Sequence, residues 1–334
     1  MAWRRVRRVV LLLVTAVSLY IVAPSLLAVF NAFPQLGDVQ PVWFVVVVIL
    51  ESASFVSLWV LLRIALRTRS WFDIASSQLA SNAASRILPG GGASGTVVQA
   101  AVLIASGYPP ARVGAALGAT GLLTTGMLLA LPLLAVPALA TGTQLAPQLE
   151  LGLIVSLIVA VLLVALGFAV LKWDRIVTAV AQAIGFLAAA LLRRSDAKTI
   201  AARIVVERDQ VAAAFSGHWL FALASAASNR MFDYAALVAA LIAVGADVRP
   251  TLVLVAYVGA VALGLVPITP GGLGFVETGL TSLLVLGGVP TDTALAGTLL
   301  YRLASYWLPI PLGAIAWAGW RARPAERRTQ PTPT

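Results

Sequence analysis

The sequence has no cysteine, one histidine and few charged side chains, which make up 11% of its 334 residues. Without cysteine, the chain has no disulfide, no thiol nucleophile and no thiolate metal site. A lone histidine also excludes a multi-histidine metal centre, so we expect neither a metal nor a cofactor. We interpret His218 as a helix-start residue at a membrane interface, and the alternative is a proton carrier.

Most of the sequence is apolar and is arranged in long runs. Hydrophobic residues make up 60% of the chain, and the mean hydropathy of +0.96 is far above that of soluble domains. Because a helix needs about 20 apolar residues to cross hydrocarbon, the long runs predict an all-α polytopic membrane protein. The expected spanning helices are 9–30, 41–66, 111–139, 149–171, 218–244 and 291–319. We interpret 9–30 as a retained N-terminal anchor helix, since no small-residue cleavage site clearly follows it.

The formal net charge of +10 is distributed unevenly along the chain. Nineteen of the 23 lysines and arginines lie in 1–8, 63–70, 107–112, 172–217 and 321–328. The positive-inside rule places these segments in the cytoplasm. We therefore expect a multi-pass protein of the cell membrane with both termini cytoplasmic, a cytoplasmic amphipathic linker at 172–217 and a cytoplasmic tail at 320–334. Basic residues beside a bilayer attract anionic headgroups, so the charge requires no nucleic-acid partner.

One segment leaves this topology open. Residues 176–192 are apolar enough for a marginal span, and a crossing there would invert the orientation of everything that follows. Two basic residues precede the segment and two follow it, so a crossing would place one basic pair outside the cell. We favour a helix that lies in the membrane interface.

A helix-breaking motif occurs twice in the apolar sequence, 181 residues apart. The stretch "ILPGGGASGT" covers 87–96 and "ITPGGLGFVE" covers 268–277, and each contains a Pro-Gly-Gly that interrupts a helix. The arms around each motif are too short for ordinary spanning helices, so we predict re-entrant hairpins at 71–106 and 250–287. A plain loop between two short full spans is the alternative. The predicted tips consist of Pro89, Gly90, Gly91, Pro270, Gly271 and Gly272.

The sequence around the two motifs also repeats. A long apolar helix precedes each hairpin and another follows it, so each unit has the order helix, re-entrant hairpin, helix. Counting the crossings from a cytoplasmic N-terminus gives the two units opposite orientations. The predicted fold is therefore two inverted repeats, together with the anchor helix and the cytoplasmic linker. Inverted repeats with broken helices are typical of transporters whose binding site lies near the middle of the bilayer.

Six ionisable side chains lie within the apolar sequence. They are Arg86, Arg230, Arg302, Glu51, Asp233 and Glu277. Because charge at membrane depth is costly, such residues are most often retained at a binding site, a proton relay or a buried pair. The equal number of each sign suggests mutual compensation. The alternatives are purely structural pairing between helices, or arginines that reach the interface from a shallower position.

The two motifs and the residues after them resemble the flippase-like transmembrane region of lysylphosphatidylglycerol synthases and its stand-alone relatives. The resemblance rests on "LPGGGASG" at 88–95 and "TPGGLGFVE" at 269–277, and it covers most of the chain. It implies movement of aminoacylated phospholipids or polyprenyl-linked sugars between leaflets. The first motif departs from the family pattern because no acid follows it, whereas the second unit keeps Glu277 and Arg302. We expect a stand-alone member without the synthase domain, since a short tail rich in proline, arginine and threonine follows residue 320.

These features predict a lipid transporter that binds an anionic, phosphate-bearing lipid and has no catalytic residue. Each Pro-Gly-Gly precedes a half-helix, 92–106 or 272–287, whose N-terminus would present free N–H groups and partial positive charge near the bilayer centre. The three arginines of the apolar sequence would hold the phosphate. Glu277 and Asp233 would pair these arginines in the empty site or carry a coupling proton.

The expected partners are membrane lipids with anionic headgroups, with an envelope glycosyl- or lipid-modifying enzyme as a further partner.

The sequence leaves two other functions open. A membrane-embedded transferase acting on lipid-linked substrates is the first alternative, and it would need a base or metal site facing a leaflet. The second alternative is a non-transporting scaffold for an envelope-lipid enzyme. Lipid transfer by the purified protein would separate transport from both.

Overall fold

The computed structural model describes residues 41–88, 90–135, 213–264 and 270–323, with the single residues 154, 157, 158, 161, 162, 165 and 209. These residues are mostly helical and contain no strand, which confirms an all-α protein over the described part of the chain. Several predicted segments lie outside the described residues. They are the span 9–30, most of the span 149–171, most of the linker 172–217 and most of the tail 320–334.

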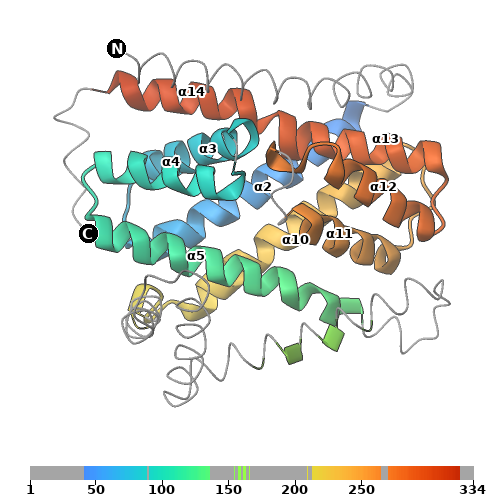
Figure 1. The fold of residues 1–334 in the computed structure, drawn as a ribbon, viewed down its shortest axis with the longest axis horizontal. Coiled ribbons are helices and arrows are strands. Elements are labelled where there is room, and N and C mark those ends of the chain that lie inside the picture. The colour runs from blue at the N-terminus through green and yellow to red at the C-terminus, as the bar shows by residue number, and fades with distance from the viewer. Residues whose placement is uncertain are drawn as a thin grey trace, which may run out of the picture.

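The first half of the described chain forms a long helix, a helical hairpin and a second long helix (Figure 1). α2 covers Pro41–Leu66, α3 covers Trp71–Ile87, α4 covers Gly92–Ala105, and α5 covers Pro110–Ala130 and continues as the 3-10 turn η1, Leu131–Ala135. The Ser70 hydroxyl caps α3 by accepting a hydrogen bond from the Asp73 N–H at 3.3 Å. Pro110 occupies the first position of α5, where a helix needs no N–H.

The second half has the same order, with its last long helix divided. α10 covers Trp219–Ala243, α11 covers Pro250–Gly264, η2 covers Pro270–Gly272, α12 covers Phe275–Leu286, α13 covers Thr291–Arg302, η3 covers Leu303–Trp307 and α14 covers Pro309–Ala322. Among the described helices, Val42–Leu66 and Pro110–Leu133 are long and apolar enough by composition to cross a membrane.

The range 291–319, which we predicted as one helix, is interrupted because of Pro309. Pro309 has no N–H to donate to the Ser305 carbonyl one helical turn earlier. The chain accommodates the proline with one π turn, η3, in which the Leu308 N–H donates to the Leu303 carbonyl at 2.9 Å. Such turns often occur at functional sites. The turn leaves the Ser305 carbonyl able to accept a hydrogen bond from another helix. The donor is Arg86 of α3.

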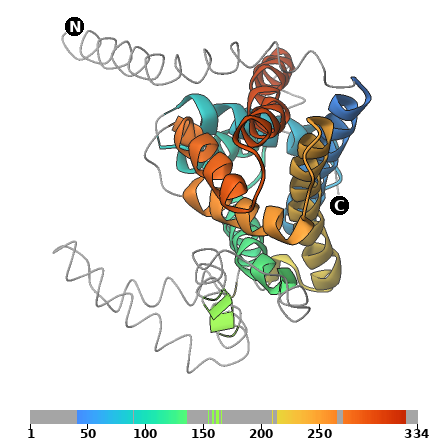
Figure 2. The ribbon, with the colours of Figure 1, turned by 90° about the vertical axis from the view of Figure 1, so that its right-hand side faces the viewer.

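α2 and α10 lie side by side in the middle of the molecule and run antiparallel (Figure 1 and Figure 2). Near the start of α2, Val47 lies in one apolar cluster with Leu237 near the end of α10. Near the end of α2, Leu61 lies in a second apolar cluster with Ala222 near the start of α10. The two apolar clusters are therefore separated along this helix pair.

A polar layer lies between the two apolar clusters. The Asn229 side-chain amide on α10 donates to the Ser54 carbonyl oxygen on α2 at 3.1 Å and to the Ser54 hydroxyl at 2.8 Å. Glu51, one helical turn before Ser54, is only 2% exposed. Arg230 and Asp233 follow Asn229 on α10. Three of the six charged residues that the sequence places at membrane depth thus lie at one level of the helix pair.

The two halves of the described chain repeat the same packing pairs. α3 packs on α4, as α11 packs on α12, and α2 packs on α5, as α10 packs on α13. α3 also packs on α14, and α11 packs on η1, so each hairpin contacts the last helical segment of the other half. The hairpins lie on opposite sides along the long axis, with their tips turned toward the middle (Figure 1). This correspondence agrees with two related units, while their inverted orientation and the re-entrant course of the hairpins stay predictions.

Glycines let α3 pack closely on both of its neighbours. Gly95 of α4 faces the backbone of α3, where an added Cβ would lie 2.7 Å from the Ser81 carbonyl oxygen. Gly313 of α14 approaches the Leu79 carbonyl of α3 in the same way. Small residues at helix contacts are typical of packing in membranes. α3, which carries Arg86 in its last turn, is therefore held between α4 and α14.

Candidate functional site

Polar side chains from seven helical elements meet at the level between the two apolar clusters. We name this group the central polar cluster. It consists of Glu51 of α2, Arg86 of α3, Arg230 and Asp233 of α10, Tyr257 of α11, Glu277 of α12, Tyr301 and Arg302 of α13, and Tyr306 of η3. The structure thus brings together all five charged residues that the sequence predicts for a site.

Arg302 and Glu277 form an ion pair inside the cluster. The distance between Arg302 Nε and Glu277 Oε1 is 2.6 Å, and the two side chains are 11% and 12% exposed. Arg302 Nη2 also donates to the Gly271 carbonyl at 3.4 Å, so the pair connects α13 to the tip of the second hairpin. Glu277 Oε2 is buried and has no hydrogen-bond partner among the described residues. One carboxylate oxygen is therefore available to a further donor.

Arg86 is held differently, because backbone carbonyls bind it in place of a carboxylate. Its Nη1 donates to the Asn82 carbonyl at 2.7 Å, and its Nη2 donates to the Ser305 carbonyl at 2.7 Å. The second of these carbonyls is the one that Pro309 leaves without a helical partner. Within the described part of the chain, Arg86 makes no ion pair, and its buried Nε has no hydrogen-bond partner. The Arg86 charge is thus fixed in position by carbonyl groups, with no ion-pair partner among the described residues.

Tyr306 connects the two hairpin tips. Its hydroxyl donates to the Arg86 carbonyl at 3.0 Å, next to the first tip. Its ring lies against Gly271 in the second tip, where an added Cβ would be 2.5 Å from the ring. The Arg302 guanidinium carbon lies 4.4 Å from the ring centroid and that of Arg86 lies 5.5 Å from it, distances suited to cation–π attraction. Both motifs therefore border the same aromatic ring.

The glycines of both tips adopt backbone conformations that other residues avoid. Gly90 and Gly91 have φ of +96° and +53°, and Gly271 and Gly272 have φ of +60° and +74°. Pro89 lies outside the described residues, and so does the side chain of Pro270. α4 begins at Gly92 as predicted, whereas α12 begins at Phe275, three residues after the predicted start, because positive φ continues to Gly274.

Asp233 is bound by two tyrosine hydroxyls. Tyr257 donates to Oδ2 and Tyr301 donates to Oδ1, each at 2.7 Å. Arg230 lies one helical turn before Asp233, on the same face of α10, and its buried Nε has no hydrogen-bond partner among the described residues. We had expected Asp233 to pair an arginine. The two tyrosine hydroxyls that donate to it instead connect α10 to α11 and α13.

The three tyrosines of the cluster were missed by sequence reasoning. Tyrosine in membrane proteins is most common at the two interfaces, so the sequence predicts no binding role for Tyr257, Tyr301 or Tyr306. A signal was present, because Tyr257 lies in the middle of an apolar run and a buried tyrosine hydroxyl usually needs a polar partner. As for metals, the described residues contain no group of three or more histidines or acids placed to hold an ion.

Gly271→Ala should destabilise the protein by about 1–3 kcal/mol, because alanine is strained at positive φ and its methyl group would overlap the Tyr306 ring. Thermal unfolding of the purified protein in detergent measures this change. Gly319→Ala is the matched control, since Gly319 is an exposed helical residue of α14 with no atom near the added Cβ. The control should be neutral or slightly stabilising. Equal stability of the two variants would contradict the packing of Tyr306 on the tip.

The chain matches a protein-family model that is described as "Lysylphosphatidylglycerol synthase TM region". The match extends over residues 6–313, which is well over half of the chain. It includes both Pro-Gly-Gly motifs and every member of the central polar cluster. No curated protein matches the chain.

Proposed function

The chain belongs to the lysylphosphatidylglycerol synthase TM region family, and from this premise we propose that it moves an anionic, phosphate-bearing lipid between the leaflets of the cell membrane. Family membership makes it a membrane protein connected with lipid metabolism. The proposed cargo is a phospholipid or a polyprenyl-linked sugar. Transport requires binding and release without a chemical step, so the proposal makes the chain a transporter and not an enzyme.

The observation that carries this proposal is the state of Arg86. A buried charge without a partner is unfavourable, so proteins retain one where a ligand or a relay uses it. Backbone carbonyls orient the Arg86 guanidinium at the junction of both hairpin tips. A guanidinium binds phosphate oxygens through a planar fork of donors. The single negative charge of a phosphodiester would compensate the charge of Arg86 without disturbing the Arg302–Glu277 pair.

The arrangement of the two hairpins supports a route for the lipid. In the proposed inverted topology, with both termini cytoplasmic, the hairpins enter from opposite leaflets and meet at Tyr306. The phosphate would bind in the central polar cluster, while the acyl or prenyl tail would stay in the surrounding lipid. Rocking of the two units would open the cluster to one leaflet at a time. The π turn η3 belongs to the second unit and contacts the first through the Arg86–Ser305 hydrogen bond, so it is suited to absorb such a movement.

Reconstitution into liposomes tests the proposed function. The purified protein should accelerate the transfer of headgroup-labelled phosphatidylglycerol from the outer to the inner leaflet, measured by loss of access to a membrane-impermeant quencher. Labelled phosphatidylcholine, which has no net charge, should move more slowly. A labelled polyprenyl phosphate sugar distinguishes the two proposed cargo classes.

Two outcomes of this experiment would contradict a transport function. Turnover of a lipid donor into a new lipid, without transfer between leaflets, would make the protein a membrane-embedded transferase. Failure to move any anionic lipid, combined with retention of an envelope glycosyl- or lipid-modifying enzyme during purification, would make it a scaffold. Transfer by the purified protein alone would exclude both.

A further inference from the structure

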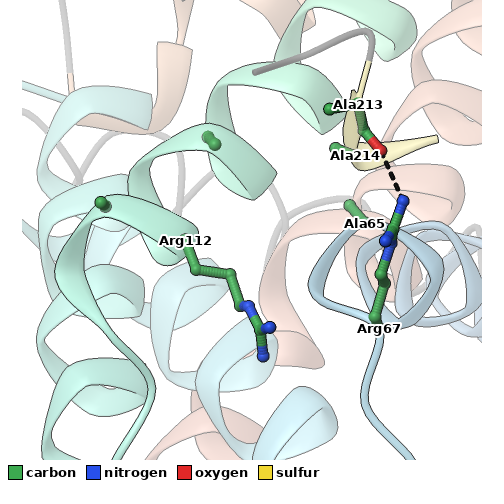
Figure 3. A pocket seen from close by; sticks show the side chains of 7 residues that line it. Ala65, Arg67, Arg112, Ala213 and Ala214 are labelled. Atoms are coloured by element: carbon green, nitrogen blue, oxygen red, sulfur yellow. Dashed lines mark hydrogen bonds between the residues drawn. The ribbon is translucent and has the colours of Figure 1, made fainter. Parts of the chain in front are cut away.

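A second basic site lies at the end of α2, away from the central polar cluster (Figure 3). It is a pocket of about 300 Å³ between the end of α2, the start of α5 and the residues that precede α10. Its lining consists of Ala65, Arg67, Ala111, Arg112, Ala115, Ala213 and Ala214. We name it the α2–α5 pocket. Its walls are therefore alanine methyl groups with two guanidinium groups among them.

Arg67 occupies a backbone position that normally belongs to glycine. The Thr68 N–H donates to the Arg63 carbonyl at 3.3 Å and the Arg67 N–H donates to the Ile64 carbonyl at 3.1 Å, the pattern of a Schellman motif. The residue after the C-cap of this motif has positive φ and is usually glycine. Arg67 has φ of +48°, the only positive φ among the described residues other than glycine. Backbone strain of this kind persists where the surrounding structure enforces it, and it is concentrated at functional sites.

The Arg67 side chain runs along the pocket from the end of α2 to the residues that precede α10 (Figure 3). Its Nη2 donates to the Ala213 carbonyl at 2.7 Å and to the Ser216 hydroxyl at 2.5 Å (Figure 3 shows the first of these bonds). These bonds use one guanidinium nitrogen, so Nε and Nη1 are left for another acceptor. The charge of Arg67 has no carboxylate partner among the described residues.

Arg112 provides the second positive charge. It lies in the first turn of α5, where the helix dipole adds partial positive charge. Figure 3 shows its side chain extending from α5 toward the lower part of the view, whereas the Arg67 guanidinium points up toward Ala213. In the described part of the chain, the Arg112 guanidinium makes no hydrogen bond and no ion pair. Neither charge of the pocket is thus compensated by a carboxylate of the residues that the structure describes.

The ends of α2 and α5 are held at a fixed distance by a buried contact. Thr68 Oγ1 and the Tyr108 hydroxyl share a hydrogen bond of 2.7 Å. Burial raises the pKa of the Tyr108 hydroxyl, so the group stays protonated at neutral pH and keeps this bond. This bond therefore connects the chain after α2 to the chain before α5, the two segments beside the pocket.

The surroundings of the pocket have the composition of a membrane interface. The Arg63 guanidinium carbon lies 4.5 Å from the ring centroid of Trp71, and Trp71 is 43% exposed. Tryptophan and arginine together at a helix end are typical of the headgroup level of a bilayer. Basic pockets between helices at this level bind lipid headgroups. The apolar alanine walls suit the glycerol part of a lipid better than a free ion.

We propose that the α2–α5 pocket binds the phosphate group of an anionic phospholipid from the adjacent leaflet. Arg67 Nε and Nη1 and the Arg112 guanidinium contact the phosphate oxygens, and the alanine methyl groups contact the glycerol. This site is separate from the central polar cluster and does not depend on transport. It would hold a lipid at the edge of the protein whether or not the cluster moves one.

The test uses the full-length protein in detergent and measures binding of dioctanoyl phosphatidylglycerol. Arg86→Gln is the background for all samples, so that binding in the central polar cluster is weakened and the α2–α5 pocket is observed. Arg67→Gly and Arg112→Gln should each weaken binding about tenfold, which is the usual effect of one charge-assisted hydrogen bond. Arg69→Gly is the matched control, because Arg69 is exposed in the same loop and does not line the pocket. It should change binding by less than about twofold.

The design separates failure of this proposal from failure to fold. Glycine is the favoured residue at φ of +48°, so Arg67→Gly should unfold at the same temperature as Arg69→Gly or higher. Equal binding by these two variants would overturn the proposal. Inorganic phosphate tests the source of the ligand: weak competition supports a lipid headgroup, and competition as strong as that of the lipid would overturn the lipid assignment. Neither outcome depends on whether the protein transports lipid in liposomes.

Discussion

Replacing Arg86 by glutamate should slow the transfer of anionic lipid at least about hundredfold, because the reversed charge repels the phosphate that Arg86 would bind. The native guanidinium already has its position set by the Asn82 and Ser305 carbonyls. An anionic lipid would therefore meet a donor group that needs no rearrangement. Glutamate would lose both of these hydrogen bonds and would add a fourth acid to the central polar cluster, beside Glu51, Asp233 and Glu277. The measurement is the rate of labelled phosphatidylglycerol transfer in liposomes.

Two variants control this experiment. Arg86→Lys keeps the charge and loses the planar fork, so it should retain part of the rate. Arg249→Glu reverses an exposed arginine in the segment between α10 and α11, so it should transfer lipid at the native rate. Native transfer by folded Arg86→Glu would refute the proposed site. Equal loss in Arg249→Glu would indicate a general effect of charge on lipid association instead.

Glu277→Ala should destabilise the protein by about 3–5 kcal/mol, the usual effect of leaving one member of a buried ion pair alone. Arg302 would keep its charge at 11% exposure and retain only the Gly271 carbonyl as a hydrogen-bond acceptor at 3.4 Å. Thermal unfolding in detergent measures the loss. Stability equal to that of the native protein would mean that water or lipid satisfies Arg302 and that the pair is not buried in the membrane.

A double variant separates the structural role of this pair from its functional role. Glu277→Leu combined with Arg302→Met replaces both charges by apolar groups and should recover most of the lost stability. If the pair takes part in transport, this stable protein should still fail to move lipid. Native transfer by the double variant would show that the pair is structural only, which is an alternative that the sequence left open.

The charged members of the central polar cluster could be predicted from the sequence for a general reason. Charge in an apolar run is unfavourable in any fold, so Arg86, Arg302 and Glu277 are conspicuous before their partners are known. Tyrosine carries no such penalty, and so Tyr306 could not be distinguished from the interface aromatics. The sequence predicts that Asp233 pairs an arginine or carries a coupling proton, and in the structure two tyrosine hydroxyls donate to it.

From the sequence alone came the helical class, the two helix breaks at the Pro-Gly-Gly motifs and the set of buried charges, whereas the break near Pro309 did not. These properties depend on local chemistry: proline lacks an N–H, glycine accepts positive φ, and an apolar run of sufficient length forms a membrane helix. Only the tertiary structure decided which groups meet. Arg86 binds the Ser305 carbonyl 219 residues away, and that carbonyl is available because Pro309 interrupts a different helix. Contacts of this kind depend on how distant helices pack, and no local pattern in the chain encodes them.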